Sequence, residues 1–199
     1  APMASMAHIS QLCKSVAHMI TERSKELVDI CINALAPRAS SFWSYIGKPG
    51  SHPPEFLLPT NWRDILPSVT EIRNGVEVEV QHRLPDIVLV NAAAGNKITV
   101  VIADPTVCWH DIDLAAERKI RAYPPLVDLI SAHLGERCSA IHLVPIAFSA
   151  RGTPPPNWSE ICAKMRFKRR ADSLLSDIQK CLLTHLHKIF RAWHKAFWA

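Results

Sequence analysis

The sequence lacks any run of eighteen apolar residues, because a charge or a proline interrupts every apolar stretch. No membrane-spanning segment is therefore expected. The first residues also lack the basic and apolar regions of a signal peptide, and residues 1–7 are interpreted as an expression scar. No internal repeat is visible, and 199 residues, 48% of them hydrophobic, suffice for one domain with an ordinary core.

Closely spaced cysteine pairs are missing as well. The six cysteines stand singly, which disfavours disulfide frameworks and predicts reduced, mostly buried thiols of an intracellular protein: Cys13, Cys31, Cys108, Cys138, Cys162 and Cys181. Ten histidines keep a zinc site open as an alternative, and the densest group is His185 and His187 near Cys181. Because residues i and i+2 of a helix point to different faces, this group is not favoured.

Positive charge is in excess, with a net charge of +5. One segment, residues 164–170, holds five cations in seven positions: Lys164, Arg166, Lys168, Arg169 and Arg170. This concentration of charge indicates a polyanionic partner. A solvated helix face or a nuclear import signal is the alternative interpretation.

The hydrophobic pattern changes its period along the first half of the chain. From residue 8 to residue 35 apolar residues recur at three- and four-residue steps, which predicts one or two amphipathic helices. Six prolines then make residues 36–68 a long connection without regular elements. An Asn74-Gly75 turn signal, alternation and β-branched runs predict three antiparallel strands, at 76–80, 87–90 and 98–102.

The second half is predicted to contain more helix. A helix is expected over 112–122, then a break at Pro124-Pro125 before a second helical stretch that ends at Gly135, followed by a strand over 139–148. This order of elements predicts a mixed α/β sheet flanked by helices. The expected organisation is one domain with a core over 8–156 and a basic, helical C-terminal extension over 157–199.

Two aspartates are expected to meet at one edge of this sheet. Asp86 begins one apolar strand and Asp104 ends the strand that pairs with it. The start of one hairpin strand lies beside the end of its partner, so the two carboxylates converge and call for a cation such as Mg²⁺ or Mn²⁺. For either aspartate alone, capping or turn formation is the alternative.

Lys119 and Tyr123 on the following helix are i and i+4, so they share a face that can look toward the acids. A metal-dependent phosphodiesterase needs such a cation to activate water or to neutralise the charge that develops on phosphate. A surface lysine beside a core tyrosine is the alternative.

Three segments resemble a known family: Arg83-Leu-Pro-Asp86-Ile-Val-Leu-Val, Ile98-Thr-Val-Val-Ile-Ala-Asp104-Pro-Thr-Val and Ala115-Ala-Glu-Arg-Lys119-Ile-Arg-Ala-Tyr123. Together they resemble the restriction-like endonuclease domain of site-specific non-LTR retrotransposons. That family combines a PD pair, a later acid and an Ala-xxx-Lys-xxx-Tyr helix. The resemblance covers residues 76–152 and implies a PD-(D/E)xK restriction-endonuclease-like fold. Thr106 stands where the simplest D-x-K pattern has lysine, a departure that the retrotransposon group shares.

The resemblance also implies roles for individual residues. Asp86 and Asp104 would be metal ligands, Lys119 the catalytic lysine and Tyr123 a supporting residue of the catalytic site. An acid from the first helix often completes such a site. Glu26 is the candidate for this third ligand, with Asp29 and Glu22 as alternatives.

The activity implied is that of a Mg²⁺- or Mn²⁺-dependent DNA endonuclease. It would nick double-stranded target DNA so that the free 3′-hydroxyl primes reverse transcription. In a longer protein a reverse transcriptase domain and the element RNA would be its partners, in the nucleus, with no membrane involved. The expected nucleic-acid contacts are Arg83, Arg151 and the five cations of residues 164–170. Three tryptophans could contact DNA or belong to the core, and the core is the favoured interpretation: Trp158, Trp193 and Trp198.

Two other functions remain open. The first is a catalytically inactive scaffold that keeps the PD-(D/E)xK-like fold and binds nucleic acid or protein, as in a central spliceosomal protein that this fold resembles. The second is another nuclease of the same superfamily, such as a restriction or junction-resolving enzyme. The Ala-xxx-Lys-xxx-Tyr helix disfavours the second.

Overall fold

The structure is a computed structural model. It describes residues 16–35, 41–44, 55–66, 69–73, 76–80, 85–92, 94–109 and 111–198. The chain divides into two compact units. The helical unit comprises Ala1–Ala36, Pro105–Ala116 and Pro145–Ala199, and the sheet unit comprises Pro37–Asp104 and Glu117–Val144. Among the described residues, no helix is long and apolar enough to cross a membrane.

A four-stranded sheet has the order β1-β4-β5-β6, with bounds Ser41–Ser44, Ile87–Ala92, Ile98–Cys108 and Cys138–Ser149. The pairs β1·β4 and β4·β5 are antiparallel. The short 3-10 turn η2 (Ala94–Asn96) lies between β4 and β5, and Gly95 adopts a positive φ of 68° there. The predicted hairpin of 87–90 and 98–102 is thus confirmed, although β5 is longer than expected.

The strands β5 and β6 run in the same direction. At their amino ends the Lys97 ammonium donates to the Glu136 carbonyl. At their carboxyl ends the Ala150 amide donates to the Cys108 carbonyl over 2.6 Å. Corresponding ends therefore meet, which only parallel strands allow, and the connection between them holds two helices. The predicted mixed α/β sheet is confirmed, and β6 matches the strand predicted over 139–148.

The two connecting helices are those that the sequence predicts, except that the proline pair forms the first turn of the second helix instead of preceding it. They are α4 (Ile112–Ala122) and α5 (Pro124–Leu134), and the 3-10 turn η3 (Gly135–Arg137) follows. The Asp111 carboxylate caps α4 by accepting from the Leu114 amide at 2.7 Å. Proline occupies the first turn of α5, where an amide hydrogen is not needed. Gly135 ends α5 at a positive φ of 55°.

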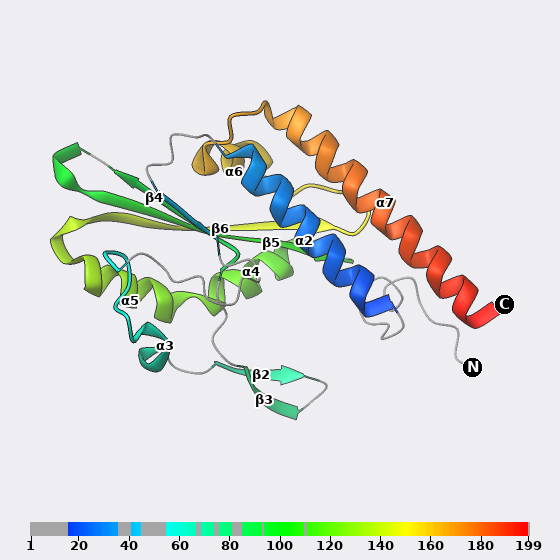
Figure 1. Ribbon diagram of the computed structural model, residues 1–199, viewed down its shortest axis with the longest axis horizontal. Helices are drawn as coiled ribbons and strands as arrows, with labels where there is room; N and C mark the ends of the chain where they lie inside the picture. Colours follow the sequence, from blue (N-terminus) through cyan, green and yellow to red (C-terminus); the bar gives the residue numbers. More distant parts are fainter. Residues whose placement is uncertain are drawn as a thin grey trace. The chain divides into compact units, whose positions relative to one another are not determined.

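The core of the sheet unit lies on one face of β4 and β5. Figure 1 shows α5 and the short helix α3 (Trp62–Ile65) on the same side of these strands. Alternate strand residues meet the apolar faces of the two helices in one buried cluster: Leu57, Leu58, Trp62, Leu66, Val88, Val90, Val100, Ile102, Tyr123, Leu126, Ile130 and Leu134. Burial at this scale supplies most of the stability of such a unit.

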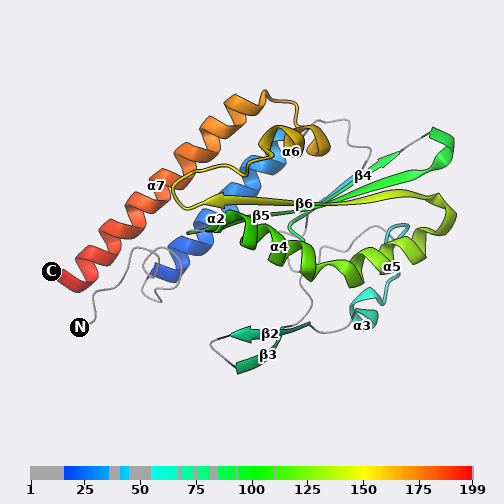
Figure 2. The same cartoon turned by 180° about the vertical axis from the view of Figure 1, so that it is seen from behind.

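The helical unit contains the long amphipathic helices of the two chain ends. The helix α2 (Ala17–Ala34) packs against α7 (Ala171–Trp198), and Figure 2 shows them side by side. The part of the first predicted helix before residue 16 lies outside the described residues. A short helix, α6 (Trp158–Met165), precedes α7 and buries Trp158, whose ring meets Phe148 edge to face. Trp158 is therefore a core residue, as favoured.

Two expectations about strands were wrong. The strand β3 (Val76–Val80) does not join β4 and β5 but pairs with β2 (Val69–Arg73) in a separate two-stranded sheet. The Pro-rich connection of residues 36–68 is not free of regular elements either. It contains β1 and α3, because a short strand can complete the edge of a sheet and Trp62 fills the core between α5 and the sheet.

None of the cysteines in the described part of the chain forms a disulfide, as expected. Cys31 and Cys181 are buried, whereas Cys108, Cys138 and Cys162 are only half-buried, so the prediction of mostly buried thiols holds in part. Cys13 lies outside the described residues.

Candidate active site

Asp86 and Asp104 are direct neighbours across the sheet. The register of β4 and β5 pairs Ile87 with Ala103, so one step further out Asp86 stands opposite Asp104. Side chains alternate between the faces of a strand, and both aspartates share a face with Val88 and Ile102. The two carboxyl groups therefore lie at the rim of the apolar cluster of the sheet unit, on the side covered by α5.

Asp104 receives two donors from the helices that follow β5. The Lys119 ammonium lies 2.7 Å from Asp104 Oδ2, and the Tyr123 hydroxyl donates to the same oxygen. The i, i+4 spacing puts both donors on one face of α4 and its end. The proline pair that opens α5 directly after Tyr123 ends α4 there. Four predicted site residues thus converge.

Burial makes this cluster electrostatically costly. Asp104 is only 4% exposed and the Lys119 side chain 23%. Desolvation, together with the charge and hydrogen bond of Asp104, raises the pKa of Asp86 to about 7, and the Lys119 ammonium opposes this rise. Two carboxylates facing each other in a desolvated site cannot both ionise cheaply, so a proton held between them stabilises the pair.

A divalent cation would fit the same arrangement. Mg²⁺ and Mn²⁺ prefer hard oxygen ligands, which the two opposed carboxyl groups offer from a rigid strand pair. A cation between them would replace the proton that the metal-free pair holds, because it neutralises both carboxylates at once. The residues present therefore suit the predicted metal, and Lys119 stands beside its ligands.

Glu26 belongs to a different unit of the chain from the other predicted metal ligands, so its role as third ligand stays a prediction. It belongs to α2 of the helical unit, where its carboxylate Oε2 lies 2.7 Å from His185 Nε2. Its side chain is 56% exposed. The structure thus brings Asp86, Asp104, Lys119 and Tyr123 together and gives Glu26 a different set of contacts. Glu22 and Asp29, the alternatives to Glu26, also lie on α2.

The cations proposed for nucleic-acid contact fall into two groups. Two of the five in residues 164–170 are paired with acids, because Lys164 lies 2.6 Å from Glu160 and Arg169 lies 2.5 Å from Asp177. Arg166, Lys168 and Arg170 are exposed and form no ion pair within the described residues. Three exposed charges on one short segment keep this stretch a candidate for phosphate contact.

Of the other two cations, Arg151 and Arg83, only Arg151 lies within the described residues. Arg151 is exposed, and its guanidinium lies 5.1 Å from the centre of the Trp109 ring. Arg83 lies outside the described residues.

The raised pKa of Asp86 makes a prediction for stability. The folded, metal-free protein keeps a proton on Asp86 that the unfolded chain loses near its ordinary pKa. The stabilisation from this proton is complete below that ordinary pKa and is lost as the pH rises through about 7. We expect Asp86→Asn, which cannot ionise, to raise the free energy of unfolding by about 1–3 kcal/mol near pH ~8 and to change it little near pH ~4, close to the ordinary pKa of the carboxyl.

Urea unfolding in the presence of a chelator measures both free energies. The control is Asp128→Asn, which changes an exposed carboxylate of α5 and should alter neither value. A loss of stability in Asp86→Asn near pH ~8 would show that the carboxylate is favourable in the fold, contrary to this electrostatic account.

Comparisons with known proteins add no assignment. No protein-family model matches the chain, and a search of curated proteins finds no match.

Proposed function

We propose that this chain is a metal-dependent DNA endonuclease with a PD-(D/E)xK-like fold. The observation that carries the proposal is the direct opposition of Asp86 and Asp104 across β4 and β5, with Lys119 bound to Asp104. Two opposed carboxylates in a largely desolvated position destabilise a strand pair unless a proton or a cation is held between them. A cation-binding role accounts for this arrangement.

The chemistry proposed is hydrolysis of a phosphodiester. A Mg²⁺ or Mn²⁺ ion held by Asp86 and Asp104 would supply Lewis acidity and lower the pKa of a bound water. Tyr123 holds Asp104 in place through its hydroxyl, since the two are hydrogen-bonded. Lys119 presents a fixed positive charge beside the carboxylates, where it can orient the attacking water or offset charge that develops on the phosphate.

The proposed substrate is double-stranded DNA. The exposed cations Arg166, Lys168 and Arg170 support a polyanionic partner, because backbone phosphates supply most of the affinity in such complexes. The resemblance of residues 76–152 to retrotransposon endonuclease domains extends the proposal to nicking for target-primed reverse transcription. A reverse transcriptase domain and element RNA as partners, and a nuclear location, belong to this proposal.

A second candidate function is a catalytically inactive scaffold that binds nucleic acid or protein. One observation favours it: Asp104, Lys119 and Tyr123 already satisfy one another through an ion pair and a hydrogen bond without any metal. Such a cluster can hold α4 against the sheet and do no chemistry. The two candidates differ in whether the protein cuts bound DNA when a divalent metal ion is present.

Nicking of a supercoiled plasmid separates the two candidates. We expect relaxed circles to appear when Mg²⁺ or Mn²⁺ is added and not when a chelator is present, while DNA binding is measured in parallel by gel shift. Linear, branched and single-stranded DNA tested beside the plasmid distinguish a nicking enzyme from a junction-resolving one. Plasmid that is bound but never cut, with either ion over a wide range of ion concentration, would favour the scaffold and refute the enzyme.

A further inference from the structure

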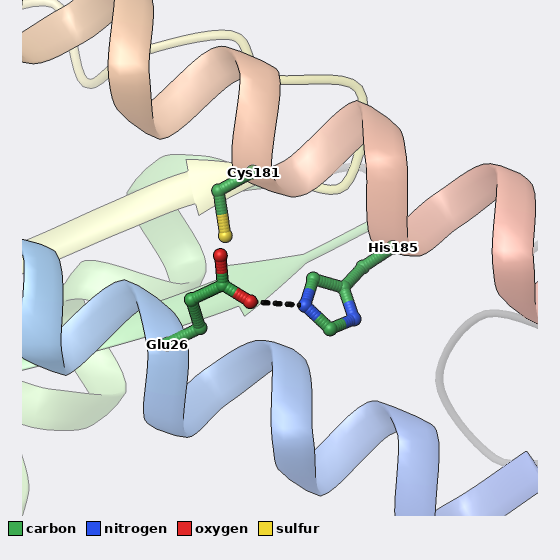
Figure 3. Close-up of side chains that lie close together, drawn as sticks. All are labelled: Glu26, Cys181 and His185. Atoms are coloured by element: carbon green, nitrogen blue, oxygen red, sulfur yellow. Dashed lines mark hydrogen bonds and ion pairs between the residues drawn. The ribbon is translucent and has the colours of Figure 1, made fainter.

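A second group of potential metal ligands belongs to the helical unit and shares no residue with the proposed active site. Cys181 and His185 are one turn apart on α7, so both point toward α2, and Glu26 reaches them from that helix (Figure 3). One sulfur, one nitrogen and one oxygen, each a possible ligand atom, lie within 4.8 Å of one another. His185 and His187 point to different faces of α7, whereas Cys181 and His185 share one.

Two of the three side chains are buried, and the third is open to solvent. Cys181 is 6% exposed and His185 is 5% exposed, whereas Glu26 is more than half exposed. His185 Nε2 lies 2.7 Å from Glu26 Oε2, and the Cys181 thiol also donates to this carboxylate. The other ring nitrogen, His185 Nδ1, has no hydrogen-bond partner within the described structure. The imidazole is therefore held through Nε2, the nitrogen that faces the other two ligands.

A nucleophilic role for Cys181 does not fit this geometry. A catalytic cysteine needs a base that removes its proton, but here the thiol and the imidazole both donate to Glu26. Burial and the Glu26 carboxylate raise the pKa of Cys181 to about 12, which makes the free thiol unreactive. The neighbouring cations Arg23 and Lys188 oppose this rise.

The donor types identify the class of ion. Thiolate, imidazole and carboxylate are the ligands of Zn²⁺ and of Co²⁺, whereas Mg²⁺ prefers oxygen alone. Tetrahedral coordination with bonds of about 2.0–2.3 Å separates ligand atoms by roughly 3–4 Å. For an ion to bind, the Cys181 thiol would lose its proton to solvent, as a coordinated thiol does, and the proton between His185 Nε2 and Glu26 would move to His185 Nδ1 or to solvent. The 2.7 Å contact of Glu26 and His185 would then open slightly. A water at the open side of Glu26 would be the fourth ligand.

We propose that Glu26, Cys181 and His185 form a binding site for one zinc-type ion, which joins α2 to α7 in the helical unit. The ion would link the two long helices through ligands on both, in addition to their apolar contacts. Binding energy from such a site stabilises the fold that contains it. The site is independent of the nuclease proposal, since it uses different residues and a different class of ion.

Cobalt binding to the whole chain tests this site, because only a thiolate ligand gives a sulfur-to-cobalt charge-transfer band. We expect a saturable band at about one equivalent of Co²⁺, lost when Zn²⁺ is added in competition. Cys181→Ser should abolish the band. His185→Gln and Glu26→Gln should weaken the affinity for Zn²⁺ more than about tenfold, since even partners outside the ligand set are worth about 10- to 100-fold.

Two variants are matched controls in the same unit. Cys162→Ser removes a half-buried free thiol of α6, and His187→Gln removes the exposed histidine two residues after His185. Both should keep the band and the affinity. Far-ultraviolet circular dichroism checks folding, and Glu26→Gln, at a half-exposed position, serves if Cys181→Ser does not fold. A wild-type protein without the band, a band that survives Cys181→Ser, or equal loss in the controls would overturn the proposal.

Discussion

Asp104→Asn is expected to reduce metal-dependent DNA cleavage by about 10³-fold or more, since a metal ion contributes several kcal/mol to stabilising the transition state. The neutral amide keeps the size of the side chain and can still accept from Tyr123, but it binds a divalent cation weakly. Plasmid nicking at a fixed Mg²⁺ concentration measures the rate. Calorimetric titration with Mn²⁺ should show the loss of ion affinity in the same variant.

Two comparisons separate this effect from unfolding. Asp128→Asn makes the same chemical change on the exposed face of α5 and should cut DNA at the wild-type rate. A thermal melt of Asp104→Asn shows whether the sheet unit remains folded. A folded Asp104→Asn protein that nicks DNA as fast as the wild type would remove Asp104 from the active site.

Lys119→Met is expected to reduce cleavage by about 10²-fold while leaving the affinity for Mn²⁺ intact or slightly higher. Methionine keeps much of the apolar stem of the side chain but removes the charge that would act on water or phosphate. Removal of an ammonium group 2.7 Å from Asp104 cannot weaken the attraction of the carboxylates for a cation. Rate constants at saturating DNA and Mn²⁺ titrations therefore separate Lys119 from Asp104.

Arg118→Met is the matched control, because Arg118 precedes Lys119 on α4 and is exposed. It should retain wild-type cleavage once DNA is saturating. If Lys119→Met lowers only the affinity for DNA, with the maximal rate unchanged, Lys119 contacts phosphate in the ground state and has no catalytic role.

The features that could be predicted from the sequence follow from the hydrophobic periodicity and the turn and cap residues of short segments. The hairpin of β4 and β5, the helix α4 and the break at Pro124 follow from β-branched runs, capping and proline chemistry. The convergence of Asp86 and Asp104 follows from the same hairpin, since antiparallel strands put the start of one beside the end of the other. These features depend on neighbours in sequence, which is why they could be predicted.

The wrong expectations concern pairing over longer distances. Asn74-Gly75 is a two-residue hairpin signal, so a strand should be expected before it as well as after it, which is where β2 lies. Four residues of β1 among prolines show no alternation to detect, because an edge strand is selected by its partner β4. The contact of Glu26 with His185 depends on how α2 packs on α7, over 159 positions of sequence.

The alternation of β4 and β5 ties the acid pair to the apolar core. Asp86 and Asp104 share a face of the sheet with the core residues Val88 and Ile102. A shift of one residue in either strand would therefore move both its carboxylate and its core residues to the opposite face of the sheet. Selection for a packed core therefore also preserves the position of the two acids. In these two strands, single-residue insertions and deletions should be rarer among functional variants than substitutions, and length changes should concentrate in the turn around Gly95.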